Sequence, residues 1–521
     1  PHFVREDILA RPAFQGGLRR LAREQGRDPA AVEREAERAL REIAATHSPL
    51  MIDVFAAMCR SSSTRGYDAL HVEPAQLERV RELASQHPVV FLPTHKSNLD
   101  NPCLRRVLHE AGMPPNHTAG GDNMNFFPAG PIARRAGIFF IRRSFKDDEV
   151  YKFVLRSYID FLIEKRFPLE WYIEGGRSRS GKLLPPRYGL LSYVVDSFRR
   201  GRSDDVVLIP VSVAYDQISE VGDYAAENRG APKEREGIRW LFRFLRRLGH
   251  RYGEITLRFG EPLSLRAALG ADGDGATDDG ARANEPEGDP ARDLAVQKLA
   301  FEVCARINQV TPITPISLAL LAVLGGGDRA QSTAEIHAAL RELVDYVERR
   351  KLPTTTKLCF ATEGDVQTTL DLLVESGVLG RFSGGPEVIY SVAPDAHLAA
   401  AYYRNTVIHF LTVPSICELA LLGAAGAPPG DGARVFWDEA LRLRDLLKFD
   451  FFFSDKARFR EELADELALH APDWERALDV PEAARGLLDA MRPFHAHRTL
   501  RAFVEAYSIV ADRLATMGDA P

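Results

Sequence analysis

The spacing of His95 and Asp100 in the run THKSNLD suits general-base chemistry on a hydroxyl group. An unperturbed imidazole has a pKa near ~6.5 and can accept a proton, while a carboxylate beside it fixes its tautomer. The same H-x4-D pattern occurs at two other places in the chain, His2/Asp7 and His117/Asp122. The spacing alone therefore does not select a catalytic pair.

The elements expected around His95 set it apart. The apolar run VVFLPT, residues 89–94, predicts a buried strand that ends directly before it. A helix expected over 99–111, capped by Asn98, places Asp100 in its first turn. The imidazole would then lie at the carboxyl end of a strand beside a carboxylate. The alternative interpretation is structural: His95 would be a hydrogen-bonded histidine without a catalytic role, and Asp100 a charge that stabilises the helix N-terminus. These residues alone do not decide between the catalytic and the structural interpretation.

Arginines follow a second apolar run, GIFFIRRSF, at residues 137–145. Arg142 and Arg143 come directly after an expected strand at 138–141. Guanidinium groups suit planar anions such as phosphate. An arginine pair on a solvated surface is the alternative interpretation.

The run EWYIEGGRSRSGKLLPP, residues 170–186, has the composition of an anion cradle. A strand would end at Glu174, glycines would expose backbone N–H groups, and arginines, serines and a lysine follow. Gly176 to Lys182 also matches the first part of a nucleotide-binding loop, GxxxxGK. Leu183 stands where Ser or Thr would bind magnesium, and two prolines prevent the required helix, so we reject an NTPase site.

Short apolar runs alternate with helical stretches between residues 85 and 310. Strands are expected at 89–94, 138–141, 169–173, 206–215 and 254–259, and helices at 99–111, 148–166 and 189–199. This alternation predicts an α/β fold with a mostly parallel sheet flanked by helices. Polar chemistry in such folds gathers at the carboxyl ends of the strands. Pro210 inside the strand 206–215 predicts an edge or a bulge.

Four parts are expected along the chain. They are an N-terminal helical region (1–84), an α/β domain (85–310), a winged-helix-like module (311–395) and a C-terminal helical region (396–521). The α/β domain would contain a mobile loop at 271–290, which is rich in glycine and acidic residues and has no large apolar side chain. Helix, helix and a hairpin with a Gly-Gly turn indicate the winged-helix-like module.

Composition limits the classes of protein and partner. A net charge of -6, with 45% hydrophobic and 27% charged residues, is typical of a globular chain without a nucleic-acid partner. Scattered cysteines without a CxxC pair predict reduced thiols and no metal site. We expect no signal peptide and no membrane-spanning helix. The most apolar stretch, 406–425, is interrupted by His409, Pro414 and Glu418 and predicts a buried helix pair.

Residues 238–252, IRWLFRFLRRLGHRY, predict an amphipathic basic helix. One face would carry Ile238, Leu241, Phe242, Leu245 and Leu248, with arginines towards the other side and Trp240 and Phe244 at the flanks. Such a helix suits an anionic membrane surface. The alternative, which the sequence supports equally, is a surface helix that packs its apolar face on the sheet.

Four blocks, THKSNLD, GIFFIRRSF, YIEGGRSRSGKL and IPVSVAYD, occur in this order. With GDNMNF (121–126) and YYRNTVIHFL (402–411), they resemble the glycerol-3-phosphate acyltransferase family, including its dihydroxyacetone-phosphate relatives, over roughly residues 85–420. The third block differs from that of lysophosphatidate acyltransferases, which usually contains EGTR. The resemblance implies the glycerolipid acyltransferase fold.

This resemblance implies that His95 and Asp100 are the catalytic pair. It also implies a polyol-phosphate site at Arg142, Glu174, Gly175, Arg177 and Ser178, to which we add Arg143 and Arg179 from charge alone. The implied reaction transfers a fatty acyl group from acyl-CoA or acyl carrier protein to the sn-1 hydroxyl of glycerol 3-phosphate. We expect no cofactor and no metal, and a peripheral location on the cytoplasmic face of the inner membrane.

Other functions remain open at this point. Dihydroxyacetone phosphate or lysophosphatidate could be the acceptor. A non-catalytic membrane scaffold and a winged-helix regulator represent other classes of protein. The hairpin RFSGGPEVIYS has no basic cluster, which argues against nucleic-acid recognition. Cys103 falls within an expected helix and is interpreted as a core residue rather than a nucleophile.

Overall fold

The computed structural model describes residues 2–122, 125, 127, 129–142, 144–145, 147–233, 237–270 and 290–517. The chain forms two compact units. The first contains residues 1–178, 183–220 and 230–310, and the second contains 179–182, 221–229 and 311–521. The division into four parts stays a prediction. The loop expected at 271–290 lies, except for Pro290, outside the described residues.

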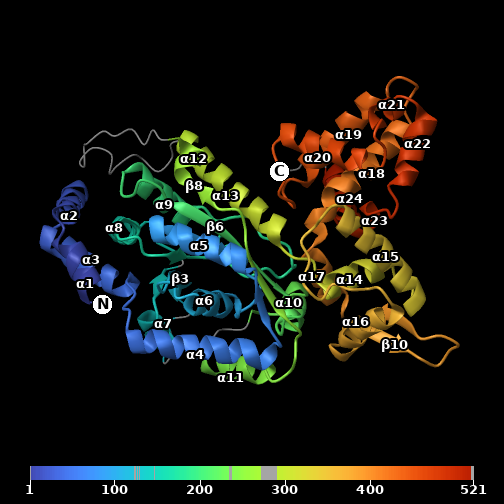
Figure 1. Ribbon diagram of the computed structural model, residues 1–521. Helices are drawn as coiled ribbons and strands as arrows, with labels where there is room; N and C mark the ends of the chain where they lie inside the picture. The colour runs from blue at the N-terminus through green and yellow to red at the C-terminus, as the bar shows by residue number, and fades with distance from the viewer. Residues whose placement is uncertain are drawn as a thin grey trace. The chain divides into compact units, whose positions relative to one another are not determined.

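A mostly parallel sheet forms the centre of the first unit, which confirms the predicted fold class (Figure 1). Its strands are β1 (Leu70–Val72), β2 (Val89–Pro93), β3 (His117–Gly121), β4 (Ile138–Ile141), β5 (Leu169–Glu170), β6 (Val207–Tyr215), β7 (Ile255–Phe259) and β8 (Leu263–Ser264). The order is β1-β7-β6-β2-β5-β3-β4, and β8 also pairs with β6. From β6 to β4 neighbouring strands run parallel, whereas β7 and β8 are antiparallel to β6.

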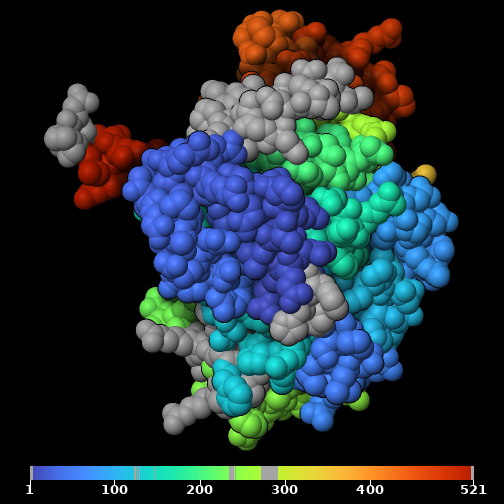
Figure 2. All heavy atoms as spheres, turned by 90° about the vertical axis from the view of Figure 1, so that its left-hand side faces the viewer, coloured from blue at the N-terminus to red at the C-terminus, as the bar shows by residue number. Residues whose placement is uncertain are grey.

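Helices flank this sheet. They are α1 (His2–Ala10), α2 (Pro12–Glu24), α3 (Pro29–Ile43), α4 (Pro49–Gly66), α5 (Pro74–Gln86), α6 (Asp100–Glu110), α7 (Ala129–Arg135), α8 (Glu149–Glu164), α9 (Gly189–Arg199), α11 (Ile238–Arg247), α12 (Leu265–Leu269) and α13 (Pro290–Val310). Helix α3 begins after Asp28, whose side chain accepts the N–H of Ala30, with Pro29 at the first helical position. It packs on α8, and Figure 2 shows α1–α3 in deep blue on the face turned to the viewer.

Pro210 does not lie on an edge strand, so the edge alternative of that prediction was wrong. Strand β6 is buried along its whole length and pairs with β2 on one side. On its other side the partner changes, because β8 pairs with residues 207–208 and β7 with residues 211–215. Pro210 lies in the gap between these two partners, where its carbonyl accepts the N–H of Gly260. A missing N–H is tolerated there because no ladder bond is interrupted.

Helices dominate the second unit. Its elements are α10 (Val221–Asn228), α14 (Pro315–Gly325), β9 (Gln331–Ser332), α15 (Thr333–Arg349), α16 (Glu363–Glu375), β10 (Leu379–Phe382), β11 (Ile389–Val392), α17 (His397–Asn405), η3 (Ile408–Leu411), α18 (Thr412–Ala425), α19 (Gly432–Leu447), α20 (Lys456–Ala468), α21 (Trp474–Leu478), α22 (Pro481–Ala490), α23 (Ala496–Thr499) and α24 (Arg501–Met517). The short sheet β10-β11-β9 is antiparallel. The segment Ile408–Ala425 is long and apolar enough to span a membrane, but 67% of it is buried within the protein, as in a core helix.

A buried ion pair between α9 and α13 provides a test of the packing in the first unit. Arg292 Nε donates to Asp196 Oδ1 at 2.8 Å, and Nη2 contacts Oδ2. Asp196→Ala would leave a buried guanidinium unpaired, so we expect it to lower the free energy of unfolding by about 3–5 kcal/mol. Urea unfolding followed by circular dichroism measures this. Asp68→Ala, which breaks the exposed pair with Arg251, should cost at most about 1 kcal/mol, and equal losses would contradict this account.

Candidate functional site

His95 and Asp100 lie side by side at the carboxyl end of β2. His95 Nδ1 is 3.1 Å from Asp100 Oδ2, and Asp100 is fully buried while the His95 side chain is 20% exposed. Because β2 ends at Pro93 and α6 begins at Asp100, the turn between them brings the two side chains together. With the Nδ1 hydrogen donated to the carboxylate, Nε2 becomes the basic nitrogen of the ring.

Asp100 accepts further hydrogen bonds. The backbone N–H groups of Lys96 and Ser97 donate to Oδ2 at 2.7 and 2.8 Å, and the Tyr215 hydroxyl donates to Oδ1 at 2.6 Å. Burial, together with the nearby Asp100 charge, raises the pKa of Tyr215, so its hydroxyl stays protonated and acts as a donor. These contacts satisfy a carboxylate that has no access to water.

The turn before α6 is held by Glu220 and is not capped by Asn98. The predicted cap was wrong, because Leu99 occupies the N-cap position and both the backbone N–H and Nδ2 of Asn98 donate to Glu220 Oε1 at 3.0 Å. The Ser97 hydroxyl donates to the same oxygen at 2.9 Å. Glu220 is itself buried. It therefore fixes the turn that carries His95.

Tyr172 stacks on the imidazole of His95. The two ring centroids are 3.7 Å apart and the ring planes differ by 13°. Tyr172 lies in the turn that follows β5, the neighbour of β2 in the sheet. This turn ends β5 after Glu170, so the strand is shorter than the predicted 169–173. The stacked ring restricts rotation of the imidazole and keeps Nε2 pointing in one direction.

Glu174 joins the histidine turn to the arginine-rich loop. Its Oε1 accepts the backbone N–H of His95 at 2.7 Å, and its Oε2 accepts that of Leu184 at 2.9 Å. Burial raises the pKa of Glu174 to about 8, against the opposing effects of these two N–H donors and the Lys96 charge. Burial also lowers the pKa of Lys96, although Glu174 and Asp100 favour its charge.

The loop after Glu174 returns to the backbone of His95. Gly175 has φ +67°, and a Cβ atom there would lie 2.7 Å from Arg187 Cγ, so glycine is required for both reasons. The buried Ser178 donates its backbone N–H to the His95 carbonyl at 2.8 Å. Arg177 is half-buried in the same loop. The structure therefore brings the segment from Glu174 to Ser178 together with His95.

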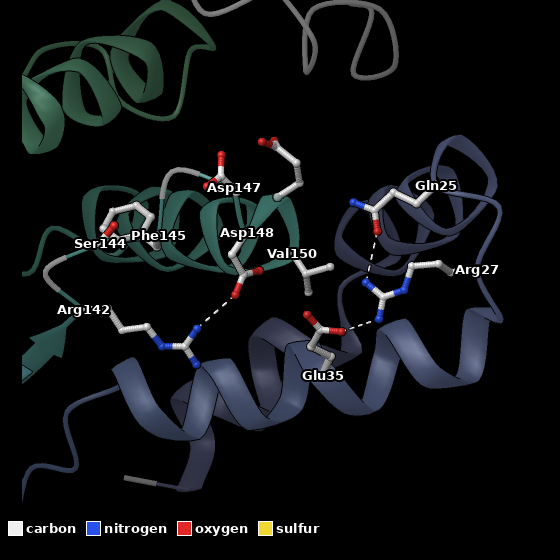
Figure 3. Close-up of a pocket in the computed structure, with 10 residues that line it drawn as sticks. Gln25, Arg27, Glu35, Arg142, Ser144, Phe145, Asp147, Asp148 and Val150 are labelled. Atoms are coloured by element: carbon white, nitrogen blue, oxygen red, sulfur yellow. Dashed lines mark hydrogen bonds and ion pairs between the residues drawn. The ribbon is translucent and has the colours of Figure 1, made fainter.

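Arg142 occupies a different place, at the end of β4 (Figure 3). Its Nε and Nη2 donate to the carboxylate of Glu42 at 2.7 and 2.6 Å, and its Nη1 donates to Asp148 at 3.0 Å. The hydrogen bonds to Glu42 raise the pKa of Arg142 above its usual range. Strand β4 is three strand spacings from β2, or about 14 Å at ~4.8 Å per spacing, so the structure does not bring Arg142 to His95.

A cavity of about 660 Å³ surrounds Arg142. It is lined by Gln25, Arg27, Glu35, Arg142, Ser144, Phe145, Asp147, Asp148, Glu149 and Val150. Figure 3 shows the carboxylates of Glu35 and Asp148 turned towards Arg27 and Arg142. Arg143 lies outside the described residues, so its predicted role is not addressed by the structure.

Arg179 and Lys182 belong to the second unit. Arg179 Nε donates to Glu227 at 2.8 Å, and its guanidinium lies 5.4 Å from the centre of the Tyr224 ring. Lys182 forms an ion pair with Asp450 at 3.0 Å. The next helix, α9, begins only at Gly189. A nucleotide-binding loop would run directly into a helix, so this geometry agrees with the rejection of an NTPase site.

Several residues of the site were missed by sequence reasoning. Tyr215 lies in the block IPVSVAYD, which by itself indicated no chemistry, and Tyr172 lies in the strand predicted before Glu174. Their alternation along expected strands could have placed them on the His95 side. Glu220 gave no signal, because its role depends on a turn more than 100 residues earlier in the chain.

Two family models match most of the chain. A family model of acyltransferases matches residues 71–214, and a model of the glycerol-3-phosphate acyltransferase C-terminal region matches residues 224–521. The putative acyltransferase plsB1 of Mycobacterium tuberculosis is 39% identical over 507 residues, which cover 96% of this chain and 79% of that protein.

Two more distant similarities were found. A glycerol-3-phosphate acyltransferase of Shewanella loihica is 33% identical over 73% of this chain and 47% of its own length. The crystal structure of the 1-acyl-sn-glycerophosphate acyltransferase PlsC from Thermotoga maritima is 16% identical over 49% of this chain and 80% of that one, with a TM-score of 0.28, which is too low to support an argument. The two family models and the plsB1 relative show that the chain belongs to the glycerol-3-phosphate acyltransferase family.

Proposed function

We propose that His95 is the general base with which this glycerol-3-phosphate acyltransferase activates its acceptor. The enzyme transfers a fatty acyl group from an acyl thioester to the sn-1 hydroxyl of glycerol 3-phosphate and forms lysophosphatidic acid, in the first step of phospholipid synthesis. The observation that carries the proposal is the 3.1 Å contact between His95 Nδ1 and the buried Asp100 carboxylate.

In the proposed step, His95 Nε2 takes the hydroxyl proton while the acceptor oxygen attacks the thioester carbonyl carbon. The carbon–oxygen bond forms, the carbon–sulfur bond breaks, and the leaving thiolate receives the proton from the imidazolium. Asp100 stabilises that imidazolium, as the carboxylate does in a serine-protease triad. Cys103 is fully buried and burial raises the pKa of its thiol, which supports direct transfer without an acyl-cysteine intermediate.

The segment from Gly175 to Ser178 is the proposed cradle for the acceptor phosphate. It lies against the His95 backbone and carries the half-buried Arg177, whose guanidinium group suits a phosphate. Holding the phosphate there would select one hydroxyl by its distance from His95. Arg142, which the resemblance implied for the phosphate, is the weaker candidate, because it lies three strands from β2 and would have to give up the carboxylates of Glu42 and Asp148. The donor would be acyl-CoA or acyl-acyl carrier protein, with no cofactor.

The role of His95 can be tested by substitution. His95→Ala should lower kcat by about 10²–10⁴, because the acceptor hydroxyl loses its base, and should leave the thermal unfolding temperature nearly unchanged. Radiolabelled glycerol 3-phosphate with an acyl thioester measures the activity. His109→Ala replaces an exposed histidine at the other end of α6 and should keep full activity. A fully active His95→Ala enzyme would disprove the assignment.

We propose further that the enzyme is a peripheral protein on the cytoplasmic face of the inner membrane, with α11 as one contact. The buried face of α11 differs from the predicted apolar face. Phe244 and Leu248 are buried, and the ring centroids of Trp240 and Phe244 are stacked 5.5 Å apart. Phe242 and Leu245 are instead exposed, by 70% and 39%. The side chains of Ile238 and Leu241 lie outside the described residues.

Helix α4 carries further exposed apolar side chains. Leu50, Val54 and Met58, spaced four residues apart, are all exposed on one face of α4. Its last residue, Gly66, accepts the N–H of Tyr252 and lies against Leu248, so α4 and the end of α11 are neighbours, as Figure 1 also shows. Exposed apolar side chains next to the arginines of α11 suit an anionic lipid surface.

Vesicle sedimentation tests the membrane contact. Phe242→Asp combined with Leu245→Asp should weaken binding to anionic vesicles by at least about tenfold, because each inserted apolar side chain contributes about 1.5–3 kcal/mol. Phe449→Asp, at an exposed phenylalanine of the second unit, serves as the matched control and should leave binding unchanged. If the double variant binds vesicles as tightly as the parent enzyme, α11 is not a membrane contact.

A further inference from the structure

A second buried carboxylate, that of Glu170, contacts the first turn of α6. Glu170 ends β5 and is fully buried. Its Oε1 accepts a hydrogen bond from Asn101 Nδ2 at 2.8 Å. Its Oε2 accepts hydrogen bonds from the Thr118 hydroxyl at 3.0 Å and from Asn116 Nδ2. Both carboxylate oxygens thus have donors, as a carboxylate without access to water requires, and all four residues belong to the first unit.

Arg105 supplies the positive charge near Glu170. It lies four residues after Asn101, on the same face of α6. Its Nη2 donates to the Thr118 hydroxyl at 3.0 Å, and its Nη1 donates to the Ala136 carbonyl at 2.6 Å. Burial raises the pKa of Glu170, and the charge of Arg105 opposes that rise. This polar network therefore attaches the first two turns of α6 to β3 and β5.

The hydrogen bond between Asn101 and Glu170 lies next to the two groups that orient the imidazole of His95. Asn101 directly follows Asp100, whose carboxylate contacts the ring nitrogen. Tyr172, whose ring stacks on the imidazole, comes two residues after Glu170. Burial raises the pKa of Tyr172, against the effect of a hydrogen bond from the backbone of Asn101. A shift of α6 relative to β5 would therefore separate the carboxylate from the stacked ring.

We propose that Asn101 and Glu170 are positioning residues for His95. They join the segment that carries the Asp100 carboxylate to the segment that carries the Tyr172 ring. The proposal rests on the proposed role of His95 as the general base. An imidazole held at one nitrogen and on one face keeps Nε2 pointing in a single direction, and a displaced base lowers the rate of the chemical step without weakening the binding of the substrates.

Steady-state kinetics of the full chain tests this role. Asn101→Ala removes the donor to Glu170, so we expect kcat to fall by about tenfold to a hundredfold, since a displacement of 1 Å can cost about 10²-fold. KM for glycerol 3-phosphate and KM for the acyl thioester should remain close to the parent values.

Gln76→Ala is the matched control for this substitution. Gln76 is also a half-buried amide that joins a helix to the sheet, because its Oε1 accepts the backbone N–H of Phe259 at 3.0 Å. That contact joins α5 to β7, which is two strands from β2. The control should therefore change neither kcat nor either KM.

Exchange of donor and acceptor separates positioning from general damage. Asn101→Asp alone places a second carboxylate against Glu170, and Glu170→Gln alone leaves the network with one acceptor too few, so each should lower kcat. The two changes together restore one donor opposite one acceptor and keep the total charge of the network. The kcat of this double variant should exceed that of either single variant.

The outcomes distinguish this proposal from the proposed role of the base. A folded Asn101→Ala enzyme with the parent kcat overturns the positioning role, as does a change confined to KM or a double variant no faster than the single ones. If Asn101→Ala does not fold, Glu170→Gln is judged by the same criterion.

His95→Ala completes the comparison. If it loses activity while Asn101→Ala does not, the base stands and the positioning role fails. If His95→Ala is fully active, both fail, while the acylation of glycerol 3-phosphate by the parent enzyme remains.

Discussion

The hydrogen-bonded carboxylate of Asp100 is the constraint on which the site depends. A fully buried carboxylate is costly unless donors surround it, and Asp100 receives hydrogen bonds from the His95 ring, two backbone N–H groups and the Tyr215 hydroxyl. The backbone donors come from the turn after β2, and Tyr215 ends β6. The Asp100 carboxylate can keep all these donors only if β2 and β6 pair in the observed register and α6 begins at Asp100.

Contacts on several sides of His95 give the H-x4-D pattern, which is common by chance, a single defined geometry. His95 is oriented by Asp100 on one nitrogen and by the Tyr172 ring on its face. Its backbone is held by Glu174 on the N–H side and by Ser178 on the carbonyl side. The His95 backbone is therefore hydrogen-bonded on both sides to the segment from Glu174 to Ser178, so a displacement of that loop would also displace the base.

Sequence reasoning located the strand before His95 and the helix after it, because apolar periodicity and helix starts are local signals. It missed β3, HTAGG, because that strand lacks the large apolar side chains that mark a buried strand, although His117 and Thr118 are buried. The partners of Arg142 could not be predicted, because Glu42 lies 100 residues away along the chain. The central position of Pro210 in the sheet could not be predicted, because a change of strand partner leaves no trace in the sequence.

The central claim is that His95 removes the proton of the acceptor hydroxyl while both substrates are bound. Initial-rate kinetics with both substrates varied, together with a search for acyl groups on the protein, tests it most directly. The account predicts intersecting reciprocal plots and no radiolabel on the protein after incubation with labelled acyl thioester alone. Parallel plots with a covalently labelled protein would contradict it, because they would show that the acyl group first passes to a side chain of the enzyme.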